Sequence, residues 1–163
     1  MGARSRRRWT RATALSIWAM LAAHPPLAAL GITVTGSWSQ TIGPANLVSG
    51  AGSDLANPYV SGAAQIILSF TGIGSKDYHV TVQRVDTSWN SNLNLYVQRT
   101  SAQGNITGGA TYMLVTTTAQ TFFNGAGNPS PSNVNVQVKL DGVSLQVPPA
   151  AYTTGLTFTV LSP

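Results

Sequence analysis

This sequence predicts an all-β fold: a two-sheet antiparallel sandwich of immunoglobulin-like type with about seven or eight strands, following an N-terminal signal peptide. Three observations lead to this prediction. Apolar and polar residues alternate in short runs, turn-forming glycines and prolines separate the runs, and no window from residue 32 onward has an extended helical period. A jelly roll or a small barrel is the alternative arrangement of such strands.

Alternation with a period of two places one face of each strand in a core and the other in water. It is clearest in residues 134–140 and recurs at 66–70, 78–82, 93–97 and 156–160. The segment 112–123 is rich in threonine and aromatic residues, which strands favour. The predicted core consists of Val34, Trp38, Ile66, Leu68, Phe70, Val80, Val82, Leu93, Leu95, Val134, Val136, Val138, Phe158 and Val160.

The segments between the strands carry three more specific predictions. Asp141-Gly142 lies between two alternating runs, a pattern typical of a two-residue hairpin. A change of phase at Val85 predicts a bulge near Gln83-Arg84. Residues 43–62 form a long connection with four glycines and two prolines, in which Asp54-Leu55-Ala56 is the expected helical turn.

The first 31 residues have the three parts of an export signal. Five arginines between Arg4 and Arg11 form a cationic segment, and Ala12–Ala23 form an apolar segment well short of the roughly 20 residues needed to span a bilayer. Ala29-Leu30-Gly31 fits a small-x-small cleavage site, with cleavage after Gly31 or, as the close alternative, after Ala29. We therefore expect a signal peptide at 1–31 and a β-sandwich domain at 32–163, secreted or held at the cell surface.

The net charge of +5 is confined to this leader. Five of the nine basic residues precede residue 12, whereas residues 32–163 contain four basic and four acidic residues and carry no net charge. Because nucleic acid is bound through clustered positive charge, this balance excludes it as a partner. Contact with a membrane is expected only through the export signal. A neutral surface rich in threonine, serine and asparagine suits packing against further copies of the chain or other surface subunits.

Residues that could carry out catalysis are scarce. There is no cysteine, and from residue 32 onward there are one histidine, His79, four aspartates and no glutamate. Acid–base catalysis needs titratable groups gathered in one pocket, and a calcium site needs closely spaced carboxylates. Asp77 and His79 would share one face of a strand, where a solvated histidine is the ordinary interpretation. We therefore expect no enzymatic activity, no cofactor and no metal site.

Two aromatic residues are the candidates for contact with a partner. Trp89 lies in a predicted turn, and Tyr96 lies in the strand that follows. A turn tryptophan can stack on a sugar or a protein, or it can fold back over the end of the sandwich, which is the more ordinary outcome. Across the same turn, Asp86 is expected to pair with Arg99.

Near the end of the chain, Val147-Pro148-Pro149-Ala150-Ala151-Tyr152 precedes the run Leu156-Thr157-Phe158-Thr159-Val160. This order resembles secreted bacterial fimbrial and spore-coat U type subunits, in which a turn similar to Pro-x-Gly-x-Tyr precedes the last strand. The resemblance covers about the last 30 residues, with Ala151 where glycine is usual and without the cysteine pair of the first sheet. It implies an immunoglobulin-like sandwich with a structural surface role and assembly by strand exchange.

Two functions agree with these features. The first is a structural or adhesive surface protein, a fimbrial or coat-type subunit that assembles through the edges of its sheets. The second is a monomeric extracellular module that binds polysaccharide or a protein partner through Trp89 and Tyr96. The extended segment Ile32–Trp38 favours the first, because such a segment can complete its own sheet or join that of a neighbour.

Overall fold

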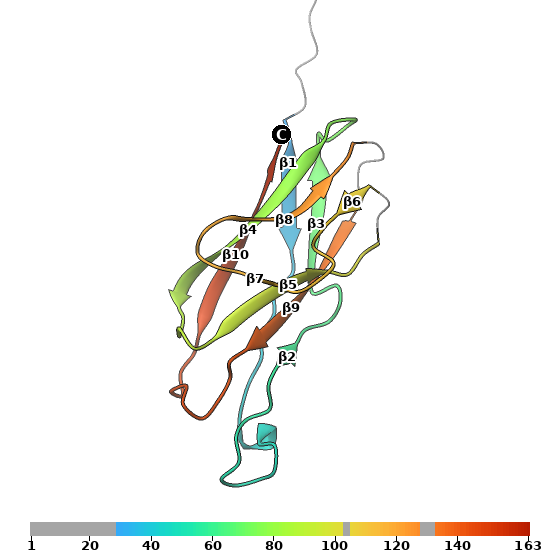
Figure 1. Ribbon diagram of the computed structural model, residues 1–163. Helices are drawn as coiled ribbons and strands as arrows, with labels where there is room; N and C mark the ends of the chain where they lie inside the picture. The colour runs from blue at the N-terminus through green and yellow to red at the C-terminus, as the bar shows by residue number, and fades with distance from the viewer. Residues whose placement is uncertain (1–28, 103–104, 128–132) are drawn as a thin grey trace, which may run out of the picture.

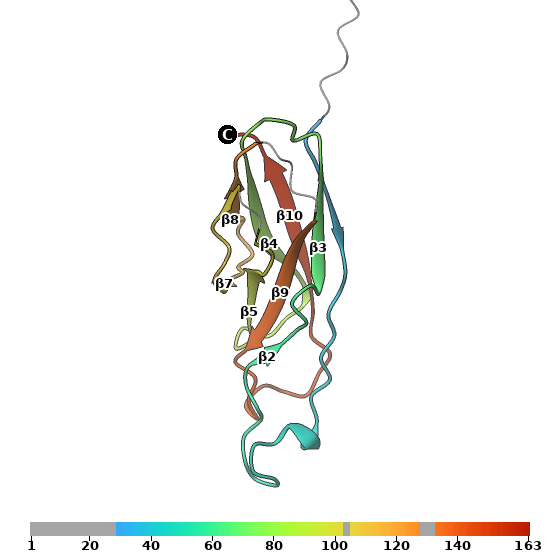
Figure 2. The ribbon, with the colours of Figure 1, turned by 90° about the vertical axis from the view of Figure 1, so that its right-hand side faces the viewer.

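The computed structural model describes residues 29–102, 105–127 and 133–163. All but the last three residues of the predicted signal peptide, 1–31, lie outside these ranges. The described residues form two antiparallel sheets packed face to face, which confirms the predicted all-β sandwich (Figures 1 and 2).

The first sheet has the strand order β1-β3-β9-β5-β7, and β2 pairs with the end of β9. The second sheet has the order β10-β4-β8-β6. The strands of the first sheet are β1 (Gly31–Thr35), β2 (Tyr59–Val60), β3 (Ile66–Thr71), β5 (Asn94–Arg99), β7 (Met113–Leu114) and β9 (Asn133–Asp141). The strands of the second sheet are β4 (Tyr78–Ser88), β6 (Ile106–Thr107), β8 (Gln120–Gly125) and β10 (Thr153–Leu161).

The longer strands lie where alternation predicts them, but the strands are more numerous than expected. Three of them, β2, β6 and β7, have only two residues each, too few to leave an alternating pattern in the sequence. The segment 112–123, expected as one strand-rich stretch, divides into β7 in the first sheet and β8 in the second. Crossings between the sheets therefore account for β6 and β7, whereas β2 is a short addition to the first sheet beside β9.

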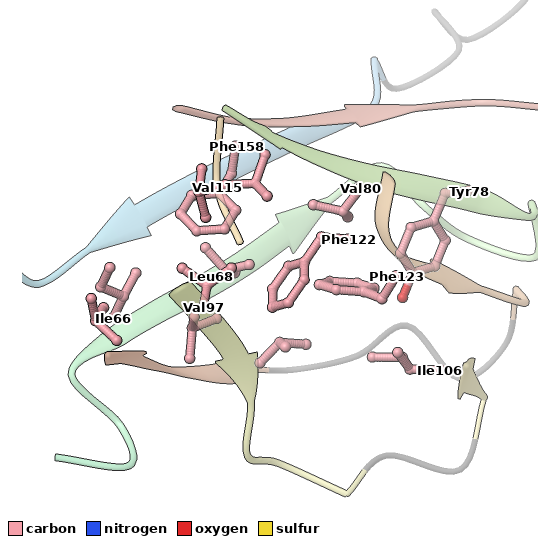
Figure 3. Packing of buried hydrophobic residues seen from close by; sticks show 14 of the residues in the cluster. Ile66, Leu68, Tyr78, Val80, Val97, Ile106, Val115, Phe122, Phe123 and Phe158 are labelled. Atoms are coloured by element: carbon pink, nitrogen blue, oxygen red, sulfur yellow. The ribbon is translucent and has the colours of Figure 1, made fainter. Parts of the chain in front are cut away.

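Inward-facing residues of both sheets form one core (Figure 3). Val80 and Val82 on β4 and Val134 and Val136 on β9 are each at most 1% exposed, as their alternation predicts. Aromatic rings link the sheets through tilted and edge-to-face contacts, with centroids 5.2–6.3 Å apart. The rings in these contacts belong to Phe70, Tyr78, Phe122, Phe123 and Phe158.

Val34 was predicted to be a core residue and is 40% exposed. It lies opposite Leu68 in the register of β1 and β3, but β1 is the outermost strand and no further described strand covers it. Trp38, Phe70 and Val160 are half-buried and pack against the core. The prediction for Val34 was wrong because alternation fixes the face on which a residue lies and not its distance from the edge of the sheet.

The predicted hairpin at Asp141-Gly142 does not form. β9 ends at Asp141, and Gly142 has a φ of +81° at a point where a Cβ would overlap the carbonyl oxygen of Asn92. The chain leaves the first sheet there and reaches the second, where β10 pairs with β4. The prediction was wrong because a local turn signal does not reveal to which sheet the next strand belongs.

The predicted bulge near Gln83-Arg84 is also absent. β4 keeps its alternation: Arg84 faces the side of the core, and Val85 is 52% exposed on the outer face. The register shifts instead at Phe122, an extra residue in β8 opposite β4, and at Thr87, an extra residue in β4 opposite β10. The irregularity in β8 lets Phe122 and its neighbour both enter the core, which a regular strand does not allow.

The long connection between β1 and β2 projects beyond the sandwich, away from the C terminus (Figures 1 and 2). Its one-turn 3-10 helix is Pro44–Asn46 and not the expected Asp54-Leu55-Ala56. The N–H of Gly43 donates a 2.9 Å hydrogen bond to the Asn46 side chain, and a proline begins the turn. The carbonyl of Asp54 accepts instead from the N–H of Val48, so that segment pairs and does not coil. Among the described residues, no helix has the length and apolar character needed to cross a membrane.

Candidate functional site

The second sheet ends in a long strand, β10, whose outer edge pairs with no other strand among the described residues. On its other side β10 pairs with β4 along its whole length, from Thr153 to Leu161. It contains no charged residue and no proline, the features with which proteins commonly protect an exposed edge. The hydroxyl of Tyr152 donates a 2.6 Å hydrogen bond to the carbonyl oxygen of Pro148, which fixes the loop leading into this strand.

The open edge of the first sheet lies on the same side of the sandwich. This edge is β1, which contacts β10 and also lacks charge and proline (Figure 1). At their other ends the two sheets finish in β7 and β6, strands of two residues each. Because a very short edge strand is itself a protection against pairing, the sandwich has one protected side and one open side.

A cleft of about 200 Å³ lies between the end of β4, the start of β5 and the segment 114–117. Its wall combines hydroxyl, amide and guanidinium groups with apolar side chains. The polar residues are Arg84, Ser91, Asn94, Thr116 and Thr117, and the apolar residues are Leu93, Leu114 and Val115. A small polar molecule fits such a cleft better than a wholly apolar one does.

Arg84 is the charged group of this cleft, and its side chain is 15% exposed. Its Nε lies 3.0 Å from Oδ1 of Asp86, but the N–H is not aligned for a hydrogen bond, so the contact is an ion pair. The guanidinium carbon lies 4.7 Å from the ring centroid of Trp89. Within the described part of the chain, the two terminal nitrogens of Arg84 make no hydrogen bond. The guanidinium of Arg84 is thus held by Asp86 and by the ring of Trp89, while its two terminal nitrogens still have N–H groups that can donate hydrogen bonds.

Trp89 and Tyr96, the two predicted partner-binding residues, lie on different surfaces. The indole of Trp89 folds back against the core, and its Nε1–H donates a 3.0 Å hydrogen bond to the carbonyl oxygen of Leu93. Tyr96 stands on the outer face of the first sheet, since its neighbours along β5 are buried. There Nζ of Lys139 lies 4.2 Å from the ring centroid of Tyr96 and 4.8 Å from that of Tyr112. No single site uses both predicted residues.

The expected ion pair between Asp86 and Arg99 is not formed. Asp86 pairs with Arg84, two residues earlier on the same strand. Nε of Arg99 donates a 3.2 Å hydrogen bond to the carbonyl oxygen of Gly108. The prediction was wrong because it assumed that the strands on either side of the turn pair with each other, whereas β4 and β5 belong to different sheets.

Arg84 itself was not predicted as a site residue, although the sequence contains a signal for it. Tyr78, Val80 and Val82 alternate on the core side of β4, and Arg84 is the next residue in phase. A charged residue at a core position is unusual enough to mark a candidate site. The bulge predicted at Gln83-Arg84 would turn Arg84 away from the core face, and so Arg84 was not recognised as a charged residue at a core position.

Asp77 and His79 occupy separate environments. Oδ1 of Asp77 accepts a 3.2 Å hydrogen bond from the N–H of Gly127, which ties together two loops at one end of the sandwich. His79 is opposite Leu161 in the register of β4 and β10, on the outer face. Across residues 29–102, 105–127 and 133–163, no group of three histidine, cysteine, aspartate or glutamate side chains is arranged to hold a metal ion.

No protein-family model matches this chain, and no curated protein or solved structure is significantly similar to it. The resemblance of the C-terminal segment to fimbrial and coat-type subunits stays a prediction. The features from which a function can be inferred are therefore the open edge of the sandwich and the cleft at Arg84.

Proposed function

We propose that this chain is an exported, non-enzymatic structural or adhesive protein of the cell surface, whose copies add to one another along the edge of β10. The observation that carries the proposal is the contrast between this nine-residue uncharged strand and the two-residue strands β6 and β7 at the opposite side of the sandwich. An unpaired edge offers a row of backbone N–H and C=O groups to another strand, and such pairing gives affinity without a preformed pocket.

A second copy of the chain is the partner that fits this edge. Residues 32–163 carry no net charge, so two copies approach each other without long-range repulsion. Antiparallel pairing of β10 with β10 of another copy is compatible with a two-fold axis, the commonest symmetry of protein oligomers. Such pairing would join the two four-stranded sheets into one continuous sheet.

Apolar side chains near the edge can add to the backbone pairing. Leu161 on β10 is 43% exposed, Val85 on the adjacent strand is 52% exposed, and Val34 on β1 is 40% exposed. Each Å² of apolar surface that a second copy covers stabilises the assembly by about 25 cal/mol. These three side chains lie at separate points near the open side of the sandwich, so each adds its own apolar contact to the pairing of the backbone edge.

Export is the other part of the proposal, and the start of the sandwich bears on where the leader is cut. Leu30 is half-buried against the core, and Gly31 already pairs with Thr71 at the start of β1. Cleavage after Gly31 would remove both contacts, whereas cleavage after Ala29 retains them. We therefore favour Ala29, and N-terminal sequencing of the exported protein should begin at Leu30. A sequence beginning at Ile32 would contradict this.

Two matched variants test assembly through β10. Thr159 on β10 and Thr121 on β8 are both exposed on the outer face of the second sheet, and both lie opposite Thr81 of β4, one on each side. Thr159→Lys introduces a charge at the edge of β10, whereas Thr121→Lys introduces the same charge on β8, at the opposite side of the second sheet, where β6 pairs with Asn124 and Gly125. Folding of each variant is checked by circular dichroism and thermal unfolding.

Native mass spectrometry and sedimentation of the exported protein then give the oligomeric state. We expect the wild-type protein and Thr121→Lys to form dimers or larger assemblies over the same concentration range. Thr159→Lys should shift the midpoint to a concentration about tenfold higher or more, which corresponds to about 1.4 kcal/mol. A wild-type protein that stays monomeric at high concentration, or equal assembly of the two variants, overturns the proposal.

A monomeric module that binds polysaccharide is the second candidate. The observation that favours it is the pair of rings, Tyr96 and Tyr112, on either side of Lys139 on the outer face of the first sheet. The hydroxyl of Tyr112 donates a 2.9 Å hydrogen bond to Oε1 of Gln137, so this ring has a fixed place. Glycan-array binding that Tyr96→Ala abolishes and Trp89→Ala retains would support this candidate. Absence of any glycan binding would exclude it.

A further inference from the structure

We propose that the cleft beside Arg84 binds an acidic sugar, a hexuronate residue whose carboxylate is recognised by the guanidinium of Arg84. This site involves β4, β5 and the segment 114–117 and does not depend on assembly through β10. It also differs from the ring pair on either side of Lys139, since neither Tyr96 nor Tyr112 lines the cleft.

The placement of Arg84 is the first part of the argument. The guanidinium follows three buried residues on the core side of β4, and its side chain is 15% exposed. Removing a cation from water is costly unless partners compensate it. Asp86 provides one ionic contact on the Nε side, and Oδ1 of Asp86 also accepts a 2.8 Å hydrogen bond from Thr154. The terminal nitrogens, which make no hydrogen bond to any described residue, remain for an anion.

The guanidinium is held in place before any ligand arrives. The ring of Trp89 lies 4.7 Å from its central carbon, and the indole N–H is itself fixed on the carbonyl oxygen of Leu93. The turn between these residues is closed by the N–H of Leu93 donating to the carbonyl oxygen of Asn90 at 3.0 Å. A planar fork oriented in this way matches the two oxygens of a carboxylate. Trp89 is thus a positioning residue that acts through Arg84.

The rest of the cleft suits a sugar ring. Its volume of about 200 Å³ is enough for one pyranose unit. Ser91 and Thr117 offer hydroxyl groups and Asn94 an amide, the groups that hydrogen-bond to sugar hydroxyls. The hydroxyl of Thr116 is already used, because it donates to the carbonyl oxygen of Thr118 and accepts from the side chain of Gln120. Leu93, Leu114 and Val115 supply an apolar wall for the C–H face of the ring. A uronic acid has both a carboxylate for Arg84 and hydroxyl groups for the remaining wall. A neutral sugar lacks the carboxylate, and a bare anion lacks the hydroxyl groups and the ring.

Titration of the full-length exported protein with D-galacturonate and D-glucuronate, followed by NMR or calorimetry, tests the site. A ligand of this size is expected to bind with a Kd on the order of 1 mM. D-galactose, which lacks the carboxylate, and sulfate, which lacks the ring, should each bind about tenfold more weakly or not at all. Equal binding of galactose and galacturonate, equal binding of sulfate, or no uronate binding overturns the proposal.

Three variants assign the binding to the cleft. Arg84→Gln should weaken uronate binding about tenfold or more, because it removes a charged hydrogen-bond donor pair. Thr117→Glu places a negative charge at the exposed rim without altering the core, so it should abolish uronate binding even if Arg84→Gln fails to fold. Lys76→Gln removes an exposed positive charge outside the cleft and should leave uronate binding unchanged. Undiminished uronate binding by Thr117→Glu, or by a folded Arg84→Gln, overturns the assignment.

The edge variant separates this site from the proposed assembly. Thr159→Lys should retain uronate binding whatever its oligomeric state, since Thr159 is on the outer face and does not line the cleft. Trp89→Phe keeps an aromatic ring beside Arg84 and should weaken uronate binding by a few fold. Trp89→Leu is its non-aromatic comparison. In the absence of ligand the unfolding curves of the two variants should be close, so a difference in their binding does not come from a loosened fold. Equal binding by Trp89→Phe and Trp89→Leu would rule out the positioning role of the aromatic ring.

Discussion

Two strands, β8 and β10, pair with opposite sides of β4 and contribute differently to the protein. In β8, Phe122, Phe123 and Gly125 are buried, and β6 pairs with the outer edge at Asn124 and Gly125. In β10 only Phe158 is fully buried, and no described strand lies beyond it. The strand on one side of β4 therefore contributes mainly buried side chains to the core. The strand on the other side has an outer edge whose backbone groups are not needed to form the core.

The largest contrast between the two strands should come from shortening a core-facing side chain. Phe123 on β8 is 1% exposed and contacts the rings of Phe70 and Phe122, whereas Leu156 on β10 is only half-buried. We expect Phe123→Ala to lower the free energy of unfolding by about 3–5 kcal/mol and Leu156→Ala by roughly half as much or less. Denaturant unfolding measures both, and equal losses would show that β10 belongs to the core as much as β8 does.

A smaller contrast comes from adding one methyl group to a glycine in each strand. A Cβ at Gly125 would overlap the ring of Tyr78, whereas a Cβ at Gly155 meets only the carbonyl oxygen of Val85, at an ordinary 3.7 Å. We expect Gly125→Ala to destabilise the protein by about 1–3 kcal/mol. Gly155→Ala should be neutral or stabilise it by up to about 1 kcal/mol, because alanine restricts the unfolded chain. Thermal unfolding of the two variants checks this. A destabilised Gly155→Ala would mean that other groups besides the carbonyl oxygen of Val85 pack against Gly155.

The smallest effect concerns the hydroxyl group of Tyr78, against which Gly125 packs. This hydroxyl is buried and has no hydrogen-bond partner among the described residues. Replacing the residue by phenylalanine removes a polar group that has lost its hydration, so Tyr78→Phe should leave stability unchanged or raise it by about 1 kcal/mol. A loss of more than about 1 kcal/mol would reveal a partner for the hydroxyl.

The same residue gives stability a dependence on alkaline pH. Burial raises the pKa of Tyr78 above its ordinary 10.0, and the positive charge of Arg99 opposes this shift. As pH rises through 10 the unfolded chain therefore loses this proton before the folded chain does. The stability that Tyr78 contributes is complete below pH 10 and is lost as pH rises above it. Unfolding midpoints measured against pH should fall less steeply above pH 10 for Tyr78→Phe than for the wild-type protein, and identical slopes would contradict this.

Periodicity was enough to predict the sheets and most of the core. Val134, Val136 and Val138 are buried as their alternation requires, because the side-chain period of a strand is a local property. The exposure of Val34 and the missing hairpin at Asp141-Gly142 depend on which strands become neighbours, and this is decided by packing between distant segments. Two-residue strands such as β6 have no pattern of their own and form only where a longer strand offers them an edge.

The candidate sites were harder to predict than the fold. Trp89 and Tyr96 are close in sequence but lie on separate surfaces, since Trp89 turns toward the core and Tyr96 faces outward. The cleft at Arg84 joins the end of β4 to residues 114–117, and neither segment indicates the other in the sequence. The open edge of β10 likewise depends on strand order, which alternation does not encode.

Backbone amide hydrogen exchange of β10, measured over a range of protein concentrations, tests pairing of this edge most directly. If β10 pairs with a second copy, its amides that point away from β4 should exchange more slowly as the protein assembles, while the amides of β6 keep their rates. Exchange in β10 that is independent of concentration, in a sample shown by mass to be assembled, would mean that the copies meet elsewhere and that the proposed use of this edge is wrong.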